Sequence, residues 1–329
     1  MFYGFESQIK RGIVPAPKVV MQSIFVQIPS YQDHELPKTI LDCIANSSGE
    51  VNVNFGVHVC WLNHNDIYIP KEYPDWVKLN YQTSIAPSNI GVLMSRYIAN
   101  EFYNGEDYYL QIDSHMKFKK NWDLELINLY NKYNNLGFNK PLITMYPSGY
   151  YYDNGFDIVK GKTDGVTTVG FTENLENFKN TYVPHQTACT TSPGCLYTAS
   201  VSGGFIFTSG DFSKIKPNKK IAFWGEEILT AARAFTSGFD LLTSDKSYAW
   251  HLYYDHSKSK QLNGRSLVWV DFSGKWEELK NESQLELNRI FDNKIIGEGA
   301  LGNVRTLEEY GVFAGLDFKN KQVTQCKWG

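Results

Sequence analysis

Short apolar runs alternate along the chain with segments whose apolar residues recur every three or four positions. The runs predict buried strands, and the recurring pattern predicts helices that pack against them. The predicted strands lie at residues 23–28, 53–61, 76–81, 107–112 and 142–146. The predicted helices lie at residues 36–45, 88–102, 122–133, 226–236 and 277–291, with Ser88 or Asn89 as the N-cap of the second. Strands and helices that alternate in this way predict an α/β fold with a mostly parallel sheet flanked by helices.

Residues 148–200 interrupt this alternation. The segment is rich in Gly, Thr, Tyr and Asn and has no clear periodicity. Compact domains seldom contain so long an irregular stretch, so we expect a functional lid or hairpin insertion here. Order resumes at 203–207, and the tail contains only the last predicted helix and a turn near 306–310. We therefore expect one main domain at 22–261, preceded by an N-terminal extension (1–21) and followed by a C-terminal extension (262–329) packed on it.

Composition narrows the function classes. Of the 329 residues, 42% are hydrophobic and 20% are charged, which is typical of a globular protein. A net charge of −3 gives no general basic surface for nucleic acid, although a local basic groove stays possible. No apolar run reaches the roughly 20 residues of a membrane helix, and residues 1–18 lack the apolar core of a signal peptide. The five cysteines include no Cys-x-x-Cys pair, so we expect reduced thiols and a cytoplasmic protein without structural zinc.

A polar cluster follows the strand predicted at 107–112. Asp113 and His115 lie two residues apart at its end, and ligands of open α/β sheets bind beyond the carboxyl ends of strands. A carboxylate oxygen and an imidazole nitrogen suit manganese, and magnesium or zinc less selectively. The alternative is an aspartate that caps a following helix, with His115 exposed beside it. His251, which stands among aromatic residues, either completes a three-ligand site or is a packed core residue.

Other polar residues are candidates for ligand binding. Tyr31 and Asp33 follow the first strand, where Tyr31 would stack on a base and Asp33 would accept a hydrogen bond from a base or ribose; the alternative is a turn with a helix cap. Arg96 would hold a diphosphate or fix Asp113, the alternative being a surface salt bridge of little energetic value. Gly203-Gly204 either allows the backbone to approach a ligand closely or forms a tight turn.

The acidic pair Glu226-Glu227 begins a predicted helix. Acids at this position are favoured by the helix dipole, which is the ordinary explanation, but this pair would also face a cleft beside the glycines. Several known catalytic patterns are missing: the sequence has no phosphate-binding P-loop, no dinucleotide-binding glycine motif, no serine-hydrolase elbow and no His-Glu-x-x-His. Nucleotide hydrolysis by a P-loop and serine hydrolysis by such an elbow are therefore disfavoured.

Together and in this order, these segments resemble the family of the cytoplasmic N-acetylglucosaminyltransferase that modifies hydroxyproline on a ubiquitin-ligase subunit. The matching blocks are residues 23–33, 108–118, 122–123, 203–205, 223–227, 251–253 and 301–310. They extend over roughly residues 22–318, and Asp113-Ser114-His115 is the most specific of them. The resemblance implies a GT-A fold, here a mixed, mostly parallel α/β sheet flanked by helices, with an irregular insertion and a C-terminal extension.

The resemblance also implies an activity. Members of this family are retaining glycosyltransferases that depend on a divalent metal and use a nucleotide sugar, usually a UDP-sugar. The sugar here would be GlcNAc-like or another hexose or pentose, and the acceptor a hydroxyl group on a protein, a glycan or a modified nucleobase. The composition suits an AT-rich microbial or viral genome, so the expected location is the cytoplasm of a microbial or virus-infected cell.

The resemblance assigns roles residue by residue. Asp113 and His115 match the Asp-x-His motif of the family, and His251 matches the later histidine that completes the ligands of Mn²⁺ or Mg²⁺. Glu226 and Glu227 match the acidic pair at the sugar and acceptor cleft and are the expected catalytic residues. The expected donor-binding residues are Ser30, Tyr31 and Asp33, which fall where uridine and ribose are held, together with Arg96, Ser114, Gly203 and Gly204.

The sequence departs from the family pattern at two positions. Gln32 stands where an arginine is common, and Ser95 stands before Arg96 where a small "AR" pair is usual. Two other functions stay open. A metal-dependent phosphoesterase would use the same three ligands but would need more acids or histidines for a second metal. A non-catalytic nucleotide-sugar-binding protein would retain the scaffold and bind UDP without turnover.

Overall fold

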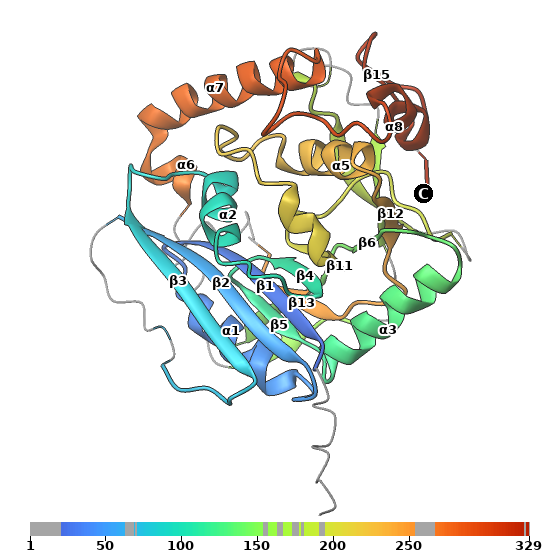
Figure 1. Ribbon diagram of the computed structural model, residues 1–329. Helices are drawn as coiled ribbons and strands as arrows, with labels where there is room; N and C mark the ends of the chain where they lie inside the picture. Colours follow the sequence, from blue (N-terminus) through green and yellow to red (C-terminus); the bar gives the residue numbers. More distant parts are fainter. Residues whose placement is uncertain are drawn as a thin grey trace, which may run out of the picture.

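The computed structural model describes residues 21–62, 69, 71–153, 157–162, 167–172, 178, 181–190, 195–253, 267–325 and 327–328. Its centre is a seven-stranded sheet with the strand order β12-β6-β11-β4-β1-β2-β3 (Figure 1). The strands are β1 (Ser23–Tyr31), β2 (Asn52–Trp61), β3 (Val77–Ile85), β4 (Tyr108–Ile112), β6 (Pro141–Thr144), β11 (Phe205–Ser209) and β12 (Asp240–Thr243). All neighbouring strands are parallel except β11, which runs antiparallel to both β4 and β6. The predicted mixed, mostly parallel sheet is thus confirmed.

Helices cover both faces of this sheet because its strands are apolar on both sides. Along β1, Ile24 and Val26 point into one core and Phe25 points into the other. The first core is closed by α1 (Leu36–Asn46) and α3 (Trp122–Asn135). The second is closed by α2 (Val92–Asn100), α5 (Glu226–Thr236), α7 (Ser273–Phe291) and α8 (Leu307–Ala314). In Figure 1, α7 runs across the top of the molecule from α6 toward α5, and α8 lies at the upper right, above β12.

A smaller sheet lies at the carboxyl end of β4. Its strands, in the order β5-β13-β7-β8, are β5 (Met116–Phe118), β13 (Ala249–His251), β7 (Ser148–Asp153) and β8 (Asp157–Lys160). The pairing of β13 with β5 sets His251 opposite Met116, and the pairing with β7 sets His251 opposite Gly149. His251 is thereby brought beside the turn that follows β4, although it lies 136 positions after His115 in the chain.

Of the lid or hairpin insertion expected at residues 148–200, the hairpin alternative is confirmed, whereas the irregularity read from the sequence does not hold for the described residues. The described part of this segment forms two antiparallel hairpins, β7 with β8 and β9 (Thr167–Thr172) with β10 (His185–Thr190). The Tyr and Thr residues that obscured the periodicity favour strands. The first hairpin is fixed by a buried carboxylate, because the hydroxyls of Tyr150 and Tyr152 donate to Glu35 at 3.2 and 2.6 Å.

Two other local predictions need correction. The second helix begins at Val92, after Gly91 at φ 113°, and neither Ser88 nor Asn89 is its N-cap. The turn predicted near 306–310 is instead the start of α8. Thr306 and Glu309 form a reciprocal capping box at the N-terminus of this helix.

The remaining elements are the 3₁₀ helix η1 (Gly210–Lys214), α6 (Val268–Asp271), β14 (Leu316–Asp317) and β15 (Gln322–Val323). Within the described part of the chain, no helix combines the length and the apolar character that crossing a membrane requires. Residues 1–20, which include most of the predicted N-terminal extension, and residues 254–266 lie outside the described residues.

Candidate active site

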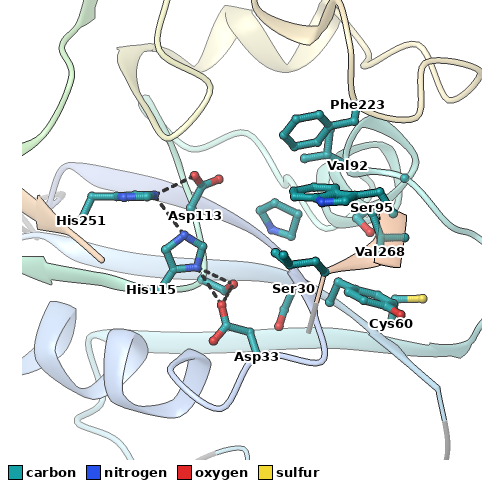
Figure 2. Close-up of a pocket in the computed structure, with 16 residues that line it drawn as sticks. Ser30, Asp33, Cys60, Val92, Ser95, Asp113, His115, Phe223, His251 and Val268 are labelled. Carbon is teal, nitrogen blue, oxygen red and sulfur yellow. Dashed lines mark hydrogen bonds and ion pairs between the residues drawn. The ribbon is translucent and has the colours of Figure 1, made fainter. Parts of the chain in front are cut away.

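Three candidate metal ligands meet at the carboxyl end of β4. The turn from β4 to β5 carries Asp113 and His115, and β13 brings His251 against them (Figure 2). One ligand atom from each of the three lies within 4.8 Å of the others. The Nε2 atoms of His115 and His251 are 2.9 Å apart, and Nε2 of His251 is 3.3 Å from Oδ2 of Asp113. The structure therefore places together the three residues that the sequence predicted as ligands.

The spacing and chemistry of these atoms fit a single divalent ion. Two ligand atoms at about 2.1 Å from an ion and at right angles to each other lie roughly 3 Å apart, close to the observed 2.9 and 3.3 Å. Burial favours the neutral form of Asp113, but the hydrogen bond with His251 and the charge of Arg96 hold the pKa of this carboxyl well below its usual range. One carboxylate with two imidazoles suits manganese or zinc better than magnesium.

Asp33 holds His115 in the orientation that a ligand needs. Its Oδ2 accepts hydrogen bonds from Nδ1 of His115 and from Oγ of Ser114, both at 2.7 Å. Its Oδ1 accepts one from the backbone N–H of Glu35 at 2.9 Å. Because Nδ1 carries the proton, the lone pair of Nε2 faces the other two ligands. The sequence predicted Asp33 as a contact of the base or ribose and missed this orienting contact.

The ligands occupy one end of a cavity of about 290 Å³. Of the predicted site residues, its walls include Ser30, Tyr31, Asp33, Asp113, Ser114, His115 and His251. Figure 2 shows the three ligands at one end and Val92, Phe223 and Val268 at the other. This second end is mainly apolar and aromatic, since Trp269 also lines the cavity and its ring lies 5.2 Å from that of Phe223.

Part of this wall was missed by the sequence analysis. Leu267, Val268 and Trp269 belong to the predicted C-terminal extension, yet they line the cavity. The hydroxyl of Tyr31 donates to Asp271 of α6 at 2.8 Å and so ties the extension to the end of β1. The only signal in the sequence was a tryptophan between two valines, a pattern that does not reveal a contact across some 240 residues.

Arg96 links the metal end of the cavity to the acidic pair. Its side chain is 1% exposed and donates to Asp113 at 2.9 Å and to Glu226 at 2.6 Å. Further donors reach the carbonyl oxygens of Gly203, at 2.7 Å, and Ile112, at 3.2 Å. The prediction that Arg96 fixes Asp113 is confirmed, and the alternative of a surface salt bridge is wrong.

Gly203 and Gly204 leave room for carboxylates. A Cβ atom on Gly204 would lie 2.8 Å from Oδ2 of Asp113, and one on Gly203 would lie 3.2 Å from the carboxylate of Glu226. The N–H of Gly203 donates to Oε1 of Glu227 at 2.9 Å. The two glycines therefore allow the loop before β11 to approach the acidic groups more closely than any other residue would.

Glu226 and Glu227 differ in their surroundings although they are neighbours. Glu226 is paired with Arg96, and its residue is 8% exposed. Burial, together with the nearby charges of Glu226 and Asp113, raises the pKa of Glu227 to about 8, against the opposing hydrogen bond from Gly203 and the charge of Arg96. Near neutral pH Glu227 thus retains a proton for much of the time, and its carboxyl group is able both to donate and to accept hydrogen bonds.

The sheet order and the cavity at its carboxyl edge define the class of fold, which is GT-A. The structure is similar to that of GalNAc-T7 with UDP, GalNAc and Mn²⁺, with a TM-score of 0.50 and 12% identity over 89% of this chain and 55% of that chain. It also matches residues 1–349 of S. aureus TarS in complex with UDP-GlcNAc, with a TM-score of 0.46 and 12% identity over 91% of this chain and 72% of that chain. This chain thus spans little more than half the length of GalNAc-T7.

The family follows from the sequence. The family described as Glycosyltransferase (GlcNAc) matches residues 78–320, well over half of the chain. The protein belongs to this glycosyltransferase family, which confirms both the resemblance and the fold that the sequence implied. No curated protein matches the sequence.

Proposed function

We propose that the protein is a metal-dependent glycosyltransferase that moves a sugar from a UDP-sugar to a hydroxyl group, with UDP-GlcNAc as the first donor to test. The observation that carries this proposal is the polarity of the cavity, which has ion ligands at one end and aromatic and apolar walls at the other. A nucleoside diphosphate sugar has the same polarity, because its charged diphosphate lies next to a flat base. The family membership supports the choice of a GlcNAc donor.

Asp113, His115 and His251 would hold the divalent ion, which when bound neutralises charge on a leaving diphosphate. Asp33 and Arg96 hold these ligands in place and need not touch the donor. In this proposal Arg96 is a positioning residue and does not bind the diphosphate, because four of its five N–H donors are engaged by protein acceptors and its side chain is 1% exposed.

Tyr31 and Ser30 remain proposed contacts of the nucleoside, since both line the cavity. Ser30 supports this assignment, because its buried Oγ has no hydrogen-bond partner among the described residues and would be satisfied by a donor hydroxyl. Ser114, Gly203 and Gly204 instead serve the shape of the metal end, through their contacts with Asp33 and the acidic groups.

The transfer is proposed to retain configuration at the anomeric carbon. The acceptor oxygen would attack that carbon on the face from which the diphosphate leaves, and its proton would pass to the departing phosphate oxygen. Glu227 would bind a sugar or acceptor hydroxyl, because its raised pKa lets it donate as well as accept. Glu226 would act through Arg96 as a positioning residue. Neither residue would become covalently bound to the sugar.

The acceptor is proposed to approach from the side of the first hairpin. Strand β7 pairs with β13 next to His251, so this hairpin adjoins the metal end of the cavity. The acceptor hydroxyl on a protein, a glycan or a modified nucleobase, and the cytoplasmic location, remain proposals from the sequence. The same is true of the division into a main domain at 22–261 and an extension at 262–329.

The test combines ligand binding with turnover. A donor that binds only the folded state raises its melting temperature, so UDP-GlcNAc, UDP-GalNAc and UDP-glucose are compared with Mn²⁺ and with a chelator. Stabilisation that needs Mn²⁺, followed by release of UDP, supports the proposal. Asp113→Asn should abolish both, whereas Asp107→Asn, at the opposite end of β4, should change neither. The absence of any response to UDP-sugars would contradict the proposal, and binding without turnover with any acceptor class would favour a binding protein.

A further inference from the structure

A buried chain of hydrogen bonds leads from β3 to the apolar end of the cavity. His58 on β2 is fully buried; its Nε2 lies 2.9 Å from Oγ of Ser84 on β3, and its Nδ1 lies 2.9 Å from Oγ of Ser95 on α2. Ser95 is 5% exposed and lines the cavity, at the end away from the metal ligands (Figure 2). The proposed transfer makes no use of these three residues.

A neutral imidazole couples the two serine hydroxyls. Burial lowers the pKa of His58 to about 4, so at neutral pH the ring has one N–H donor and one lone-pair acceptor. If Ser84 donates to Nε2, then Nδ1–H donates to Ser95, and the hydroxyl proton of Ser95 is left for a ligand. In the other tautomer Ser95 donates to Nδ1 and presents only lone pairs. The protonated nitrogen of His58 thus decides whether the hydroxyl proton of Ser95 is free for a ligand or is used by the imidazole.

The position of Ser95 determines which part of a donor it would meet. With the diphosphate at the metal ligands, the nucleoside extends toward the other end of the cavity, which Tyr31, Phe223 and Trp269 also line. These rings provide stacking surfaces that do not distinguish one base from another. Hydrogen bonds to the base edge must therefore supply any discrimination between bases. Ser95 provides a hydroxyl at this end of the cavity, at a position where the resemblance leads one to expect a small apolar side chain.

We propose that Ser84, His58 and Ser95 form a relay that selects the base of the nucleotide donor, with Ser95 donating to a carbonyl oxygen of the base. This inference rests on the proposed function. The favoured ligand class is a nucleoside diphosphate with a keto group on the base edge, as in uracil or guanine. Cytosine and adenine have an amino group at the equivalent position, which would leave the hydroxyl proton of Ser95 without an acceptor there. In this relay Ser84 would donate to Nε2 of His58, which leaves Nδ1–H to donate to Ser95.

The experiment measures dissociation constants of UDP, GDP, CDP and ADP by calorimetry at saturating Mn²⁺. The variants are Ser95→Ala and Ser84→Ala, with Ser88→Ala as the matched control, because Ser88 is exposed and meets Cys60 through its backbone carbonyl. Wild type should bind the keto nucleotides more tightly than the amino nucleotides, and the UDP and GDP arms distinguish a pyrimidine site from a purine site. One neutral hydrogen bond changes a dissociation constant by about 3- to 10-fold.

Ser95→Ala should reduce the preference for keto over amino bases by that factor. Ser84→Ala should also reduce the preference for keto bases, because the tautomer of His58 is then no longer fixed. Ser84 is not among the residues that line the cavity, so this effect would have to pass through His58. Ser88→Ala should leave it unchanged. The melting temperature of each unliganded variant confirms that the fold is intact.

Several results would overturn the relay. One is a wild-type protein that prefers amino bases. Another is a Ser95→Ala variant that keeps the preference for keto bases, or that loses affinity equally for all four nucleotides. A third is a reduced preference in Ser95→Ala that Ser84→Ala does not share. Failure of the wild-type protein to bind any of the four nucleotides would instead contradict the proposed function itself, and the relay with it.

Discussion

Replacement of Asp33 by asparagine should weaken metal binding although Asp33 is not one of the three ligands. The carboxylate accepts hydrogen bonds on both oxygens, from His115 and Ser114 on Oδ2 and from the backbone of Glu35 on Oδ1. Asparagine has the same shape but only one acceptor oxygen. If that oxygen faces His115, the amide NH₂ meets the N–H of Glu35, and if the amide is turned, the NH₂ meets Nδ1 of His115. Either arrangement sets two donors against each other.

The expected magnitude follows from the role of such outer contacts. Loss of the carboxylate that orients a histidine ligand typically reduces metal affinity by about 10- to 100-fold, which corresponds to about 1.4 to 2.7 kcal/mol. Asp33→Asn also removes the negative charge that lies 2.7 Å from Nδ1 of His115. We therefore expect the dissociation constant of Mn²⁺ to rise within that range, with a small change in the melting temperature of the metal-free protein.

Electron paramagnetic resonance measures this directly, because free Mn²⁺ gives a signal that is lost on binding. Wild type, Asp33→Asn and the control Asp107→Asn are titrated under the same conditions. Asp107 accepts hydrogen bonds from Ser23 at 2.8 Å, also next to β4 but at its other end. The reasoning is refuted if a folded Asp33→Asn binds Mn²⁺ within about twofold of wild type. It is equally refuted if Asp107→Asn loses as much affinity.

Other substitutions test the remaining contacts of the site. Gly204→Ala places a Cβ atom 2.8 Å from Oδ2 of Asp113, so it should weaken Mn²⁺ binding in the same titration by about tenfold or more, and unchanged affinity would contradict the close approach. Arg96→Met leaves Asp113 and Glu226 without their shared cation. Urea denaturation should therefore show that the free energy of unfolding falls by about 3 to 5 kcal/mol, and a fall of less than about 1 kcal/mol would contradict this prediction. The pKa of Glu227 is raised from 4.5 to about 8, so the folded state retains a proton that the unfolded state releases. The resulting stability is complete below about pH 4.5 and is lost as the pH rises through about 8. Relative to Glu227→Gln, the wild-type free energy of unfolding should therefore fall by about 1.4 kcal/mol per pH unit in that window, and parallel pH profiles would exclude the shift.

The sequence predicted the parts of the site that follow directly from a strand. Asp113 and His115 come immediately after β4, and the rule that ligands bind beyond strand ends needs no knowledge of distant contacts. Helix α5 begins and ends as predicted because its apolar spacing is regular. By contrast, the hairpins within 148–200 were obscured, because tyrosines and threonines alternate weakly in hydrophobicity while still favouring strands.

The orienting contacts could not be predicted, because they join residues far apart in the chain. Asp33 and His115 are 82 positions apart, and Arg96 and Glu226 are 130 positions apart. Each of these residues also has an ordinary local interpretation, as a turn residue, a surface charge or a helix-start acid. Only the arrangement of strands shows that they meet, and that arrangement depends on how β4 lies between β1 and β11.

The buried charges around the three candidate ligands favour binding of a divalent ion. Arg96 is shared by Asp113 and Glu226, and Asp33 adds a third carboxylate through His115. Glu227 adds little charge near neutral pH, since its pKa is about 8. With both histidines neutral, as ligands must be, three carboxylates and one guanidinium leave a net charge of −2 in a largely buried space. A divalent cation compensates that charge, and the diphosphate of a donor would then meet the ion and not the carboxylates. The raised pKa of Glu227 is thus part of the same balance, because a fourth ionised carboxylate would leave the site negative even with the ion bound and would repel the anionic donor.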